Sequence, residues 1–548
     1  MRLASRYLPM FVVAACAFSG GAIGQVTQYL SQADFDNACR VGGLISTSGV
    51  DVRLRQEITL TCSVTVQVKG GDLYIDRRVY GRKHSSPQAP GLKSFSLTLN
   101  TTCGSRRTSP LNYCGSVYTS WIIDLSGSDG ALGIDANPEG SGTGGQGGTG
   151  GSGGFFTVNT VASANIYGGV ITSGANGGNG GSAGFTTCGG GQANGGHGGT
   201  AGKAGDITIS QLQARGSQHA IRVASSSTTP GLVANGANGG AGGTAGPGSV
   251  VGCGGASGSG GNGMSGSSGG TVRISGKYIE MSAAQYSPNI LANGGSGAPG
   301  ANAGPTTTEA CELVGDGKDP GASLTDCPSG GPINSGAAGL SGNGANGGAV
   351  KIVAGATLQG SIYAEANGGA GANGTTGSSG GVMLLDTCEI ECCGSGRMSP
   401  DAGDGGSGGD VSISGGGIWY SASLSVRGGN GGWGDGVGNE GRIAASNACP
   451  PECRTGYRGG NAGDGGNGGS IAFDGSQIGY TSAYIDNFGG SGGNGGNAGG
   501  HNLQGGTAGN AGAQGLVSNT TQPPIDLFFS PFLPSDGVEG NASGPCPD

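Results

Sequence analysis

The chain has few of the residues that normally fill a hydrophobic core. Aromatic residues make up 5% of its 548 residues, and charged residues make up 11%. Glycine (131 residues) and proline (22 residues) together make up about 28%, a share that without a repeat period is typical of low-complexity disorder. A period is present here. We therefore favour a repeat protein over a disordered glycine-rich chain.

The sequence also lacks an apolar run long enough to cross a membrane. Its most apolar stretch lies near the start, after Arg2 and Arg6, and is too short to span a bilayer. A positive start followed by a short apolar stretch predicts that residues 1–24 are an export signal. An alternative interpretation is that residues 13–16 form a bacterial lipoprotein box, in which Cys16 carries the lipid.

An excess of basic residues is missing too. Removal of Arg2 and Arg6 with the signal leaves 23 basic against 34 acidic residues, a net charge of −11. Nucleic acid binding needs clustered cations, so we do not expect a nucleic acid partner. The four histidines fall in four separate segments, and no phosphate-binding loop follows a strand. The sequence thus predicts no catalytic residue and no enzyme activity.

Cysteine is the reactive residue that is present in quantity. Fourteen cysteines follow the predicted signal, and in an exported chain they indicate disulfides, each worth ~2–4 kcal/mol. The two closely spaced groups, at 388–393 and 449–453, could also suggest a metal site, but zinc sites usually add a second ligand set. The disulfide candidates are Cys39, Cys62, Cys103, Cys114, Cys188, Cys253, Cys311, Cys327, Cys388, Cys392, Cys393, Cys449, Cys453 and Cys546.

Two further sets of residues have simpler interpretations. The richest acidic cluster falls between Cys311 and Cys327, where solvated carboxylates are expected and calcium is the only cofactor worth testing. Its members are Glu309, Glu312, Asp316, Asp319 and Asp326. Four sequons would be glycosylated only in a eukaryotic host. They begin at Asn100, Asn373, Asn519 and Asn541.

Residues 25–139 have an ordinary composition and alternate apolar with polar side chains. The alternation covers residues 50–54, 58–62, 64–68, 73–75 and 95–99, and a period of two is typical of half-buried strands. Residues 29–39 alone resemble a short helix. We expect a β-rich N-terminal domain or cap, followed by repeats in 140–515 and a C-terminal tail in 516–548.

Six segments in the repeat region open in the same way, with glycine followed by two alternating apolar residues. They start near 154, 205, 270, 348, 409 and 469. Recurrence at intervals of 51 to 78 residues indicates stacked repeats rather than one globular core. In the last three repeats, the apolar positions cover about 18 residues, close to one coil of a β-solenoid. The predicted fold class is all-β, with solenoid-like coils and long glycine-rich arms.

The glycine-rich arms between these strands should not fold alone. Ordering one residue costs ~1–2 kcal/mol, whereas a net hydrogen bond returns ~0.5–1.5 kcal/mol. We therefore expect arms from adjacent coils to hydrogen-bond side by side as extended threefold polyglycine helices, similar to polyproline II. Glycine would be needed there because the backbones approach closely. Cysteines in the outer segments would cross-link the bundle.

Runs such as residues 175–181 and 489–496 resemble the glycine-rich repeats of mycobacterial surface proteins. They are also similar to the polyglycine-helix bundles of springtail antifreeze protein and of phage tail-tip adhesins. The resemblance spans residues 140–515 and implies an extracellular scaffold or adhesin, without transferring any site residue. We expect other matrix or surface components, or polysaccharide, as partners, together with self-association.

These features favour a secreted or cell-surface structural protein of a matrix, coat or wall, with adhesive contacts. An ice- or polysaccharide-binding protein is the alternative, although the varied residues of the repeat openings do not form the threonine ladder that suits ice. A solenoid carbohydrate-active enzyme is a further alternative. It would require carboxylates that converge on neighbouring coils.

Overall fold

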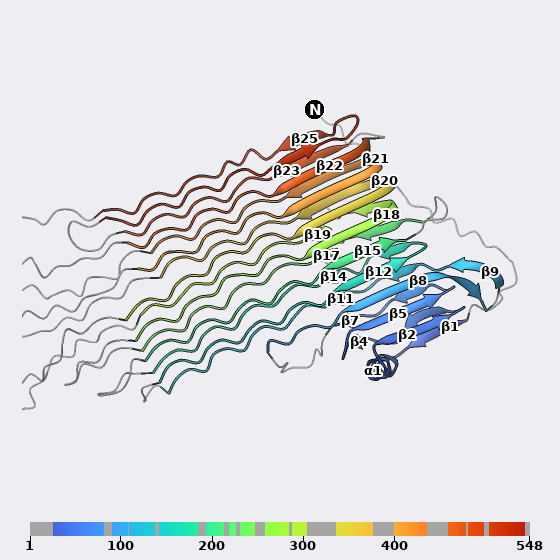
Figure 1. Cartoon of the computed structure of the whole chain (residues 1–548), viewed down its shortest axis with the longest axis horizontal. Helices are drawn as coiled ribbons and strands as arrows, with labels where there is room; N and C mark the ends of the chain where they lie inside the picture. Colours follow the sequence, from blue (N-terminus) through green and yellow to red (C-terminus); the bar gives the residue numbers. More distant parts are fainter. Residues whose placement is uncertain are drawn as a thin grey trace, which may run out of the picture.

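The computed structural model describes residues 26–81, 90–107, 109–137, 142–184, 193–212, 219–225, 231–246, 258–283, 288–303, 336–375, 399–435, 459–477, 481–497 and 504–542. The regular secondary structure in this part of the chain is β-strand, apart from a single helix, α1 (Gln32–Arg40). Its strand pairs are parallel except for one hairpin. The strands stack along one axis, and glycine-rich segments project from them to one side (Figure 1).

The parallel pairs fall into three columns, and the chain visits them in turn. The first column contains β2 (Leu44–Ser48), β5 (Val64–Lys69), β8 (Leu97–Arg106), β12 (Phe156–Thr160), β15 (Ile207–Gln211), the first parts of β18 (Thr271–Ser282), β20 (Ala349–Glu365) and β21 (Asp410–Ser425), then β22 (Ser470–Gln477) and β24 (Val517–Asn519).

The second and third columns continue each turn of the chain. The second contains β1 (Thr27–Leu30), β3 (Asp51–Leu54), β6 (Leu73–Ile75), β10 (Val117–Thr119), β13 (Ala164–Ile166), β16 (Ile221–Ala224) and the middle parts of β18, β20 and β21. The third contains β4 (Ile58–Thr59), β7 (Val79–Tyr80), β11 (Ile123–Asp124), β14 (Val170–Ile171), β17 (Leu232–Val233), β19 (Ile290–Leu291), the ends of β20 and β21, β23 (Ser482–Asp486) and β25 (Asp526–Phe529).

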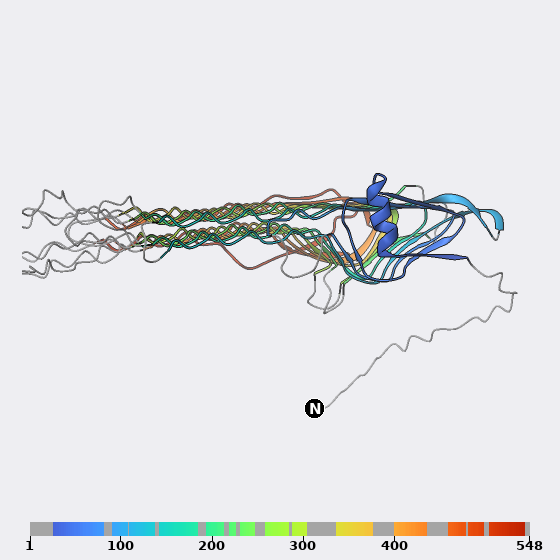
Figure 2. The same ribbon diagram turned by 90° about the horizontal axis from the view of Figure 1, so that it is seen from below.

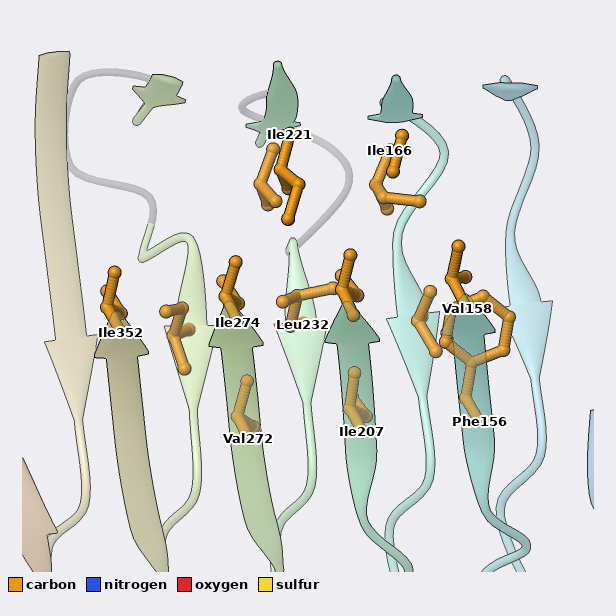
Figure 3. Packing of buried hydrophobic residues seen from close by; sticks show 14 of the residues in the cluster. Phe156, Val158, Ile166, Ile207, Ile221, Leu232, Val272, Ile274 and Ile352 are labelled. Carbon is orange, nitrogen blue, oxygen red and sulfur yellow. The ribbon is translucent and has the colours of Figure 1, made fainter. Parts of the chain in front are cut away.

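The core consists of ladders of apolar side chains that point between the columns. The first apolar residues of the six predicted openings lie in register and are at most 1% exposed: Phe156, Ile207, Val272, Val350, Val411 and Ile471. Figure 3 shows part of this packing, where a side chain from one strand rests on its counterpart in the next. Burying one such side chain contributes ~1.5–3 kcal/mol. The repeat openings are therefore the strands that set the register of the stack.

Strand pairing passes through both ends of the repeat region without a break. Leu97 of β8 pairs with Phe156 of β12, so the described strands of residues 25–139 belong to the same stack. Residues 516–548, expected as a tail, contain β24 and β25, which pair with β22 and β23. The strand predictions within 50–54, 58–62, 64–68, 73–75 and 95–99 are confirmed by β3, β4, β5, β6 and β8.

Helix α1 covers the N-terminal end of the core. The prediction of a helix from Tyr29 was wrong at its start, because residues 27–30 pair with β3 and the helix begins at Gln32. The Gln32 side chain bonds both the N–H and the C=O of Thr59 in β4, at 2.8 and 2.7 Å. Phe35, 2% exposed, lies against the core. The helix thus covers the first strands of the stack.

The glycine-rich segments run out from the third column and back into the first, in two layers (Figure 2). We call them outgoing and return arms. The outgoing arms are 126–136, 172–184, 234–246, 292–303, 366–375, 426–435, 487–497 and 535–541, and the return arms are 142–154, 193–205, 258–270, 336–348, 399–409, 459–469 and 504–515.

Backbone hydrogen bonds join the arms within and between the layers, with a period of three residues. In an outgoing arm, Gly177 donates to Asn238 of the next outgoing arm, at 3.1 Å. The following residue, Gly178, donates to Gly148 of a return arm, at 2.8 Å. The third residue of each triplet faces outward, and we call it the outer residue. The arms bond to one another side by side, as the free-energy comparison predicts.

Close approach of the backbones explains why glycine dominates the two inner positions of each triplet. A Cβ added to Gly178 would overlap the Ala131 carbonyl oxygen, and one added to Gly177 would overlap the Gly199 carbonyl. Backbone atoms cannot move aside as a flexible side chain can. The spacing of the arms thus depends on hydrogen at these positions.

We predict that Gly178→Ala destabilises the arms. The added methyl group overlaps a backbone carbonyl, and overpacking of this kind costs ~1–3 kcal/mol. Thermal unfolding and hydrogen exchange of residues 126–205 would measure the effect. Gly355→Ala in β20 is the control, because its nearest neighbour, the Cα of Lys277, would lie at 3.7 Å. Equal stability of the two variants would contradict the prediction.

Candidate functional site

Two of the predicted disulfides lie in the described residues. Cys39 of α1 is bonded to Cys62, which lies just before β5, with Cα atoms 5.6 Å apart. Cys103 and Cys114 join β8 to β9 (Ser109–Cys114) across the antiparallel hairpin. The other candidates lie outside the described residues: Cys188, Cys253, Cys311, Cys327, Cys388, Cys392, Cys393, Cys449, Cys453 and Cys546.

The acidic cluster at 309–326 and Cys16 also lie outside the described residues. Within the described ranges, no group of three or more His, Cys, Asp or Glu residues is placed to hold a metal ion. No helix in those ranges is both long and apolar enough to cross a membrane. His197 takes part in the arm bundle, where its Nδ1 accepts the N–H of Asn262 at 3.0 Å.

All four sequon asparagines are described, and they differ in how their side chains are used. Asn100 accepts a hydrogen bond from the side-chain amide of Asn159 at 3.0 Å, and Asn373 accepts one from a backbone N–H, so both asparagines use Oδ1. Asn519 instead donates through Nδ2 to the carbonyl of Ile525, at 3.1 Å. A glycan is attached at Nδ2, so Asn519 is the least suited of these three. Asn541 donates its backbone N–H to Asn497.

A buried polar network links the β8–β9 hairpin to the second column. One guanidinium nitrogen of Arg106, Nη2, lies 3.2 Å from Asp51 and 3.3 Å from Asp72, two carboxylates whose residues are 4% and 5% exposed. The Tyr113 hydroxyl donates to Asp72, as does the N–H of Ser116 at 2.7 Å. The guanidinium also lies 3.5 Å from the centroid of the Tyr113 ring.

Burial shapes the chemistry of the tyrosines around this network. Burial first, and then the carboxylates of Asp72 and Asp51, raise the pKa of Tyr74 to about 12. Burial and the hydrogen bond to Asp72 raise the pKa of Tyr113 as well. Both phenols therefore stay neutral at physiological pH. Both Asp72 oxygens accept hydrogen bonds from protein groups, and a guanidinium lies between the two carboxylates. The consequence of this arrangement is mechanical: it ties the hairpin to the coils.

We predict that Arg106→Met destabilises the N-terminal coils by up to about 3–5 kcal/mol, because it leaves two buried carboxylates without their cation. Denaturant unfolding would measure the loss. Arg107→Met is the matched control: Arg107 is exposed, and surface substitutions usually stay within ~0.5 kcal/mol. A similar small loss in both variants would show that the network does not hold the hairpin.

The outward face of the first column carries a short threonine row. Four threonines lie in register on successive strands, and basic residues then take their place at Arg273 and Lys351. The threonines are Thr65, Thr98, Thr157 and Thr208. A flat ice-binding face needs a regular row over many coils. The interruption after four strands matches the irregularity expected from the sequence.

The outward face of the second column carries stacked aromatic and arginine side chains instead. The row runs from Tyr29 through Arg53 and Tyr74 to Tyr118, in register. The guanidinium of Arg53 lies 4.2 Å from the centroid of the Tyr74 ring. The rings of Tyr74 and Tyr118 stack at 4.8 Å with an angle of 8° between their planes. Each ring therefore lies one strand spacing from the next.

Three further residues extend this row into a patch. At the turn before the third column, Arg78 lies 5.6 Å from the centroid of the Trp121 ring. The Tyr167 hydroxyl bonds Asn165, which is in register with Tyr118. We call the set the aromatic–arginine patch: Tyr29, Arg53, Tyr74, Arg78, Tyr118, Trp121 and Tyr167. It holds five of the 17 tyrosines and tryptophans in the chain, and Tyr29, Trp121 and Tyr167 are 60%, 44% and 47% exposed.

The patch has the composition of a binding surface. Tyrosine, tryptophan and arginine are enriched at the centres of protein interfaces, because they combine large contact area with hydrogen-bonding groups. Guanidinium groups also bind carboxylates with two parallel hydrogen bonds. The sequence did not reveal the patch, because its members on successive strands of the second column are separated by about 20 to 50 residues along the chain. Only the register of the strands brings them together.

No family model, curated protein or solved structure matches this chain.

Proposed function

We propose that this chain is a secreted or cell-surface structural protein of an extracellular matrix, coat or wall. Its fold is a β-solenoid whose coils carry polyglycine II-like arms, arranged in two layers. The observation that carries the proposal is the hydrogen bonding between arms: most of the inner N–H groups are bonded to a neighbouring arm, within the same layer or in the other. A plate built in this way resists bending and stretching, because deformation breaks many backbone bonds together.

Further observations support a structural role. Apolar ladders run along the stack from the first coils to the last, so no hinge interrupts the described strands. The two disulfides hold the N-terminal coils, where the stack begins. Disulfides are typical of extracellular proteins, and the predicted export signal agrees with that location.

Localisation of the native protein tests the proposal. Immunogold labelling of intact cells, with extraction of the insoluble matrix or wall fraction, should place the protein in that fraction. A secreted protein from the same cells that has no known matrix role is the control for non-specific retention in that fraction. Detection of this protein only as a freely diffusing species would overturn the structural role.

The aromatic–arginine patch supports a second function within such a matrix, the binding of polysaccharide. Exposed rings offer apolar faces to sugar rings, and Arg78 offers a cation to carboxylates, whereas Arg53 already lies 3.6 Å from the carboxylate of Asp76. The chain as a whole is acidic, so the exposed guanidinium of Arg78 stands out from its surroundings. Acidic polysaccharides, such as uronic acid polymers, are therefore the favoured class.

We predict that the double variant Arg78→Ala, Trp121→Ala weakens binding to a uronic acid polymer at least tenfold, since such anchor residues contribute ~2 kcal/mol or more. Isothermal titration would measure the affinity. Trp433→Ala is the matched control, because Trp433 is 61% exposed but lies on an arm. Equal binding by both variants would exclude the patch as the binding site of the polymer. Equal affinity for a neutral glucan would exclude the preference for acidic chains.

A further inference from the structure

The arms contain a recurring contact between an Asn–Gly pair and one residue of the next arm in the same layer. In the example of Asn179 and Gly180, the glycine N–H donates to the carbonyl of Ala241, at 2.9 Å. The asparagine Oδ1 accepts the N–H of the same Ala241, at 3.0 Å. Both backbone groups of the outer residue are thus held from one side. We call this contact the Asn–Gly clamp.

Every Asn–Gly pair in the sequence forms this clamp. The fourteen pairs begin at Asn176, Asn179, Asn194, Asn235, Asn238, Asn262, Asn293, Asn343, Asn346, Asn367, Asn373, Asn430, Asn467 and Asn494. The side chain of the clamped residue varies from alanine to tryptophan. The clamp therefore uses only backbone groups of its partner.

Asn–Gly pairs carry a characteristic chemical liability. The backbone nitrogen of the glycine attacks Cγ of the asparagine, a new C–N bond closes a succinimide ring, and the side-chain nitrogen leaves as ammonia. Water then opens the ring to aspartate or isoaspartate. Glycine favours the reaction because it has no Cβ to hinder the attack and because its backbone is the most mobile.

The clamp holds both reacting groups away from the geometry of this reaction. The glycine N–H must lose its proton to attack, but here it donates to a carbonyl of the next arm. The asparagine side chain must turn its Cγ toward that nitrogen, but here its Oδ1 accepts the N–H of the same residue of that arm. Separation of the two arms releases both groups together.

We propose that the fourteen Asn–Gly pairs are latent deamidation sites, which the folded bundle keeps intact and which convert only where an arm separates from its neighbour. The two products have different consequences. Aspartate keeps an acceptor oxygen, and Asp129, Asp404 and Asp464 already occupy the asparagine place in equivalent clamps. Isoaspartate adds an atom to the backbone, so it breaks the three-residue period and the arm cannot return. Arm opening thus becomes irreversible.

Peptide mapping by mass spectrometry, during incubation of the full chain at mildly alkaline pH, tests the proposal. The folded chain should deamidate roughly ten- to hundredfold more slowly than the same chain in guanidinium, since each clamp contributes two hydrogen bonds. The order of sites within the folded chain gives an internal control. The clamp of Asn494 holds Val538 in arm 535–541, beyond which the described residues place no further arm, so Asn494 should convert before Asn238.

Two variants separate the effect of the clamp from that of general stability. Gly178→Ala, which disturbs the bundle locally, should speed conversion at Asn176 and Asn179, whereas Gly355→Ala in β20 should leave both rates unchanged. Equal rates in the folded and unfolded chains would overturn the proposal. Conversion of Asn238 before Asn494 would overturn it too. The test uses purified protein, so its outcome is independent of where the protein resides and of whether it serves a structural role.

Discussion

The close approach of backbones in the arms is the constraint on which the rest of the structure depends. Neighbouring arms are near enough for direct N–H to carbonyl bonds in two directions, and this leaves room only for glycine at most inner positions, with alanine at a few, such as Ala175 and Ala301. Such segments bury almost no side chains, so they contribute little hydrophobic free energy. Their order comes from many simultaneous bonds. Those bonds require the arms to start at fixed spacing, which the strand columns provide.

The columns in turn explain why the sequence alternates two kinds of segment. Apolar ladders such as Phe156, Ile207 and Val272 set the stacking distance of the strands. That distance becomes the distance between arms, because each arm begins where a strand ends (Figure 1). At the N-terminal end, where α1 and the hairpin replace arms, side-chain contacts and disulfides take over the role of the inter-arm bonds.

Much of this architecture can be predicted from the sequence, and the features that were not predicted were missed for identifiable reasons. Alternation of apolar and polar residues predicted β5 and β6, and the glycine–apolar openings predicted the repeat strands. Both patterns place an apolar side chain at every second position, as a strand that contributes to a buried ladder requires. The balance of entropy against hydrogen bonding predicted that arms associate. The start of α1 was missed because tertiary pairing of residues 27–30 overrides their local preference.

The candidate sites were less accessible to sequence reasoning. The aromatic–arginine patch depends on register across coils, and so does the contact of Arg106 with Asp51 and Asp72. The Asn–Gly clamp did leave a signal, since asparagine repeatedly precedes glycine in the arms. This signal is hard to distinguish from low-complexity sequence, because the residue that the clamp holds can be of any type. A contact to backbone groups imposes no pattern on the partner side chain.

Because the clamp does not depend on the side chain that it holds, such a chain can gain whole repeats. A clamp that accepts Ala241, Leu340 or Trp433 alike would accept the outer residue of a newly inserted coil. Duplication of one coil with its two arms would therefore produce compatible neighbours at once, without compensating changes on either side. The array is thus open to expansion and contraction by whole units, and its length is a variable that selection can adjust separately from its sequence.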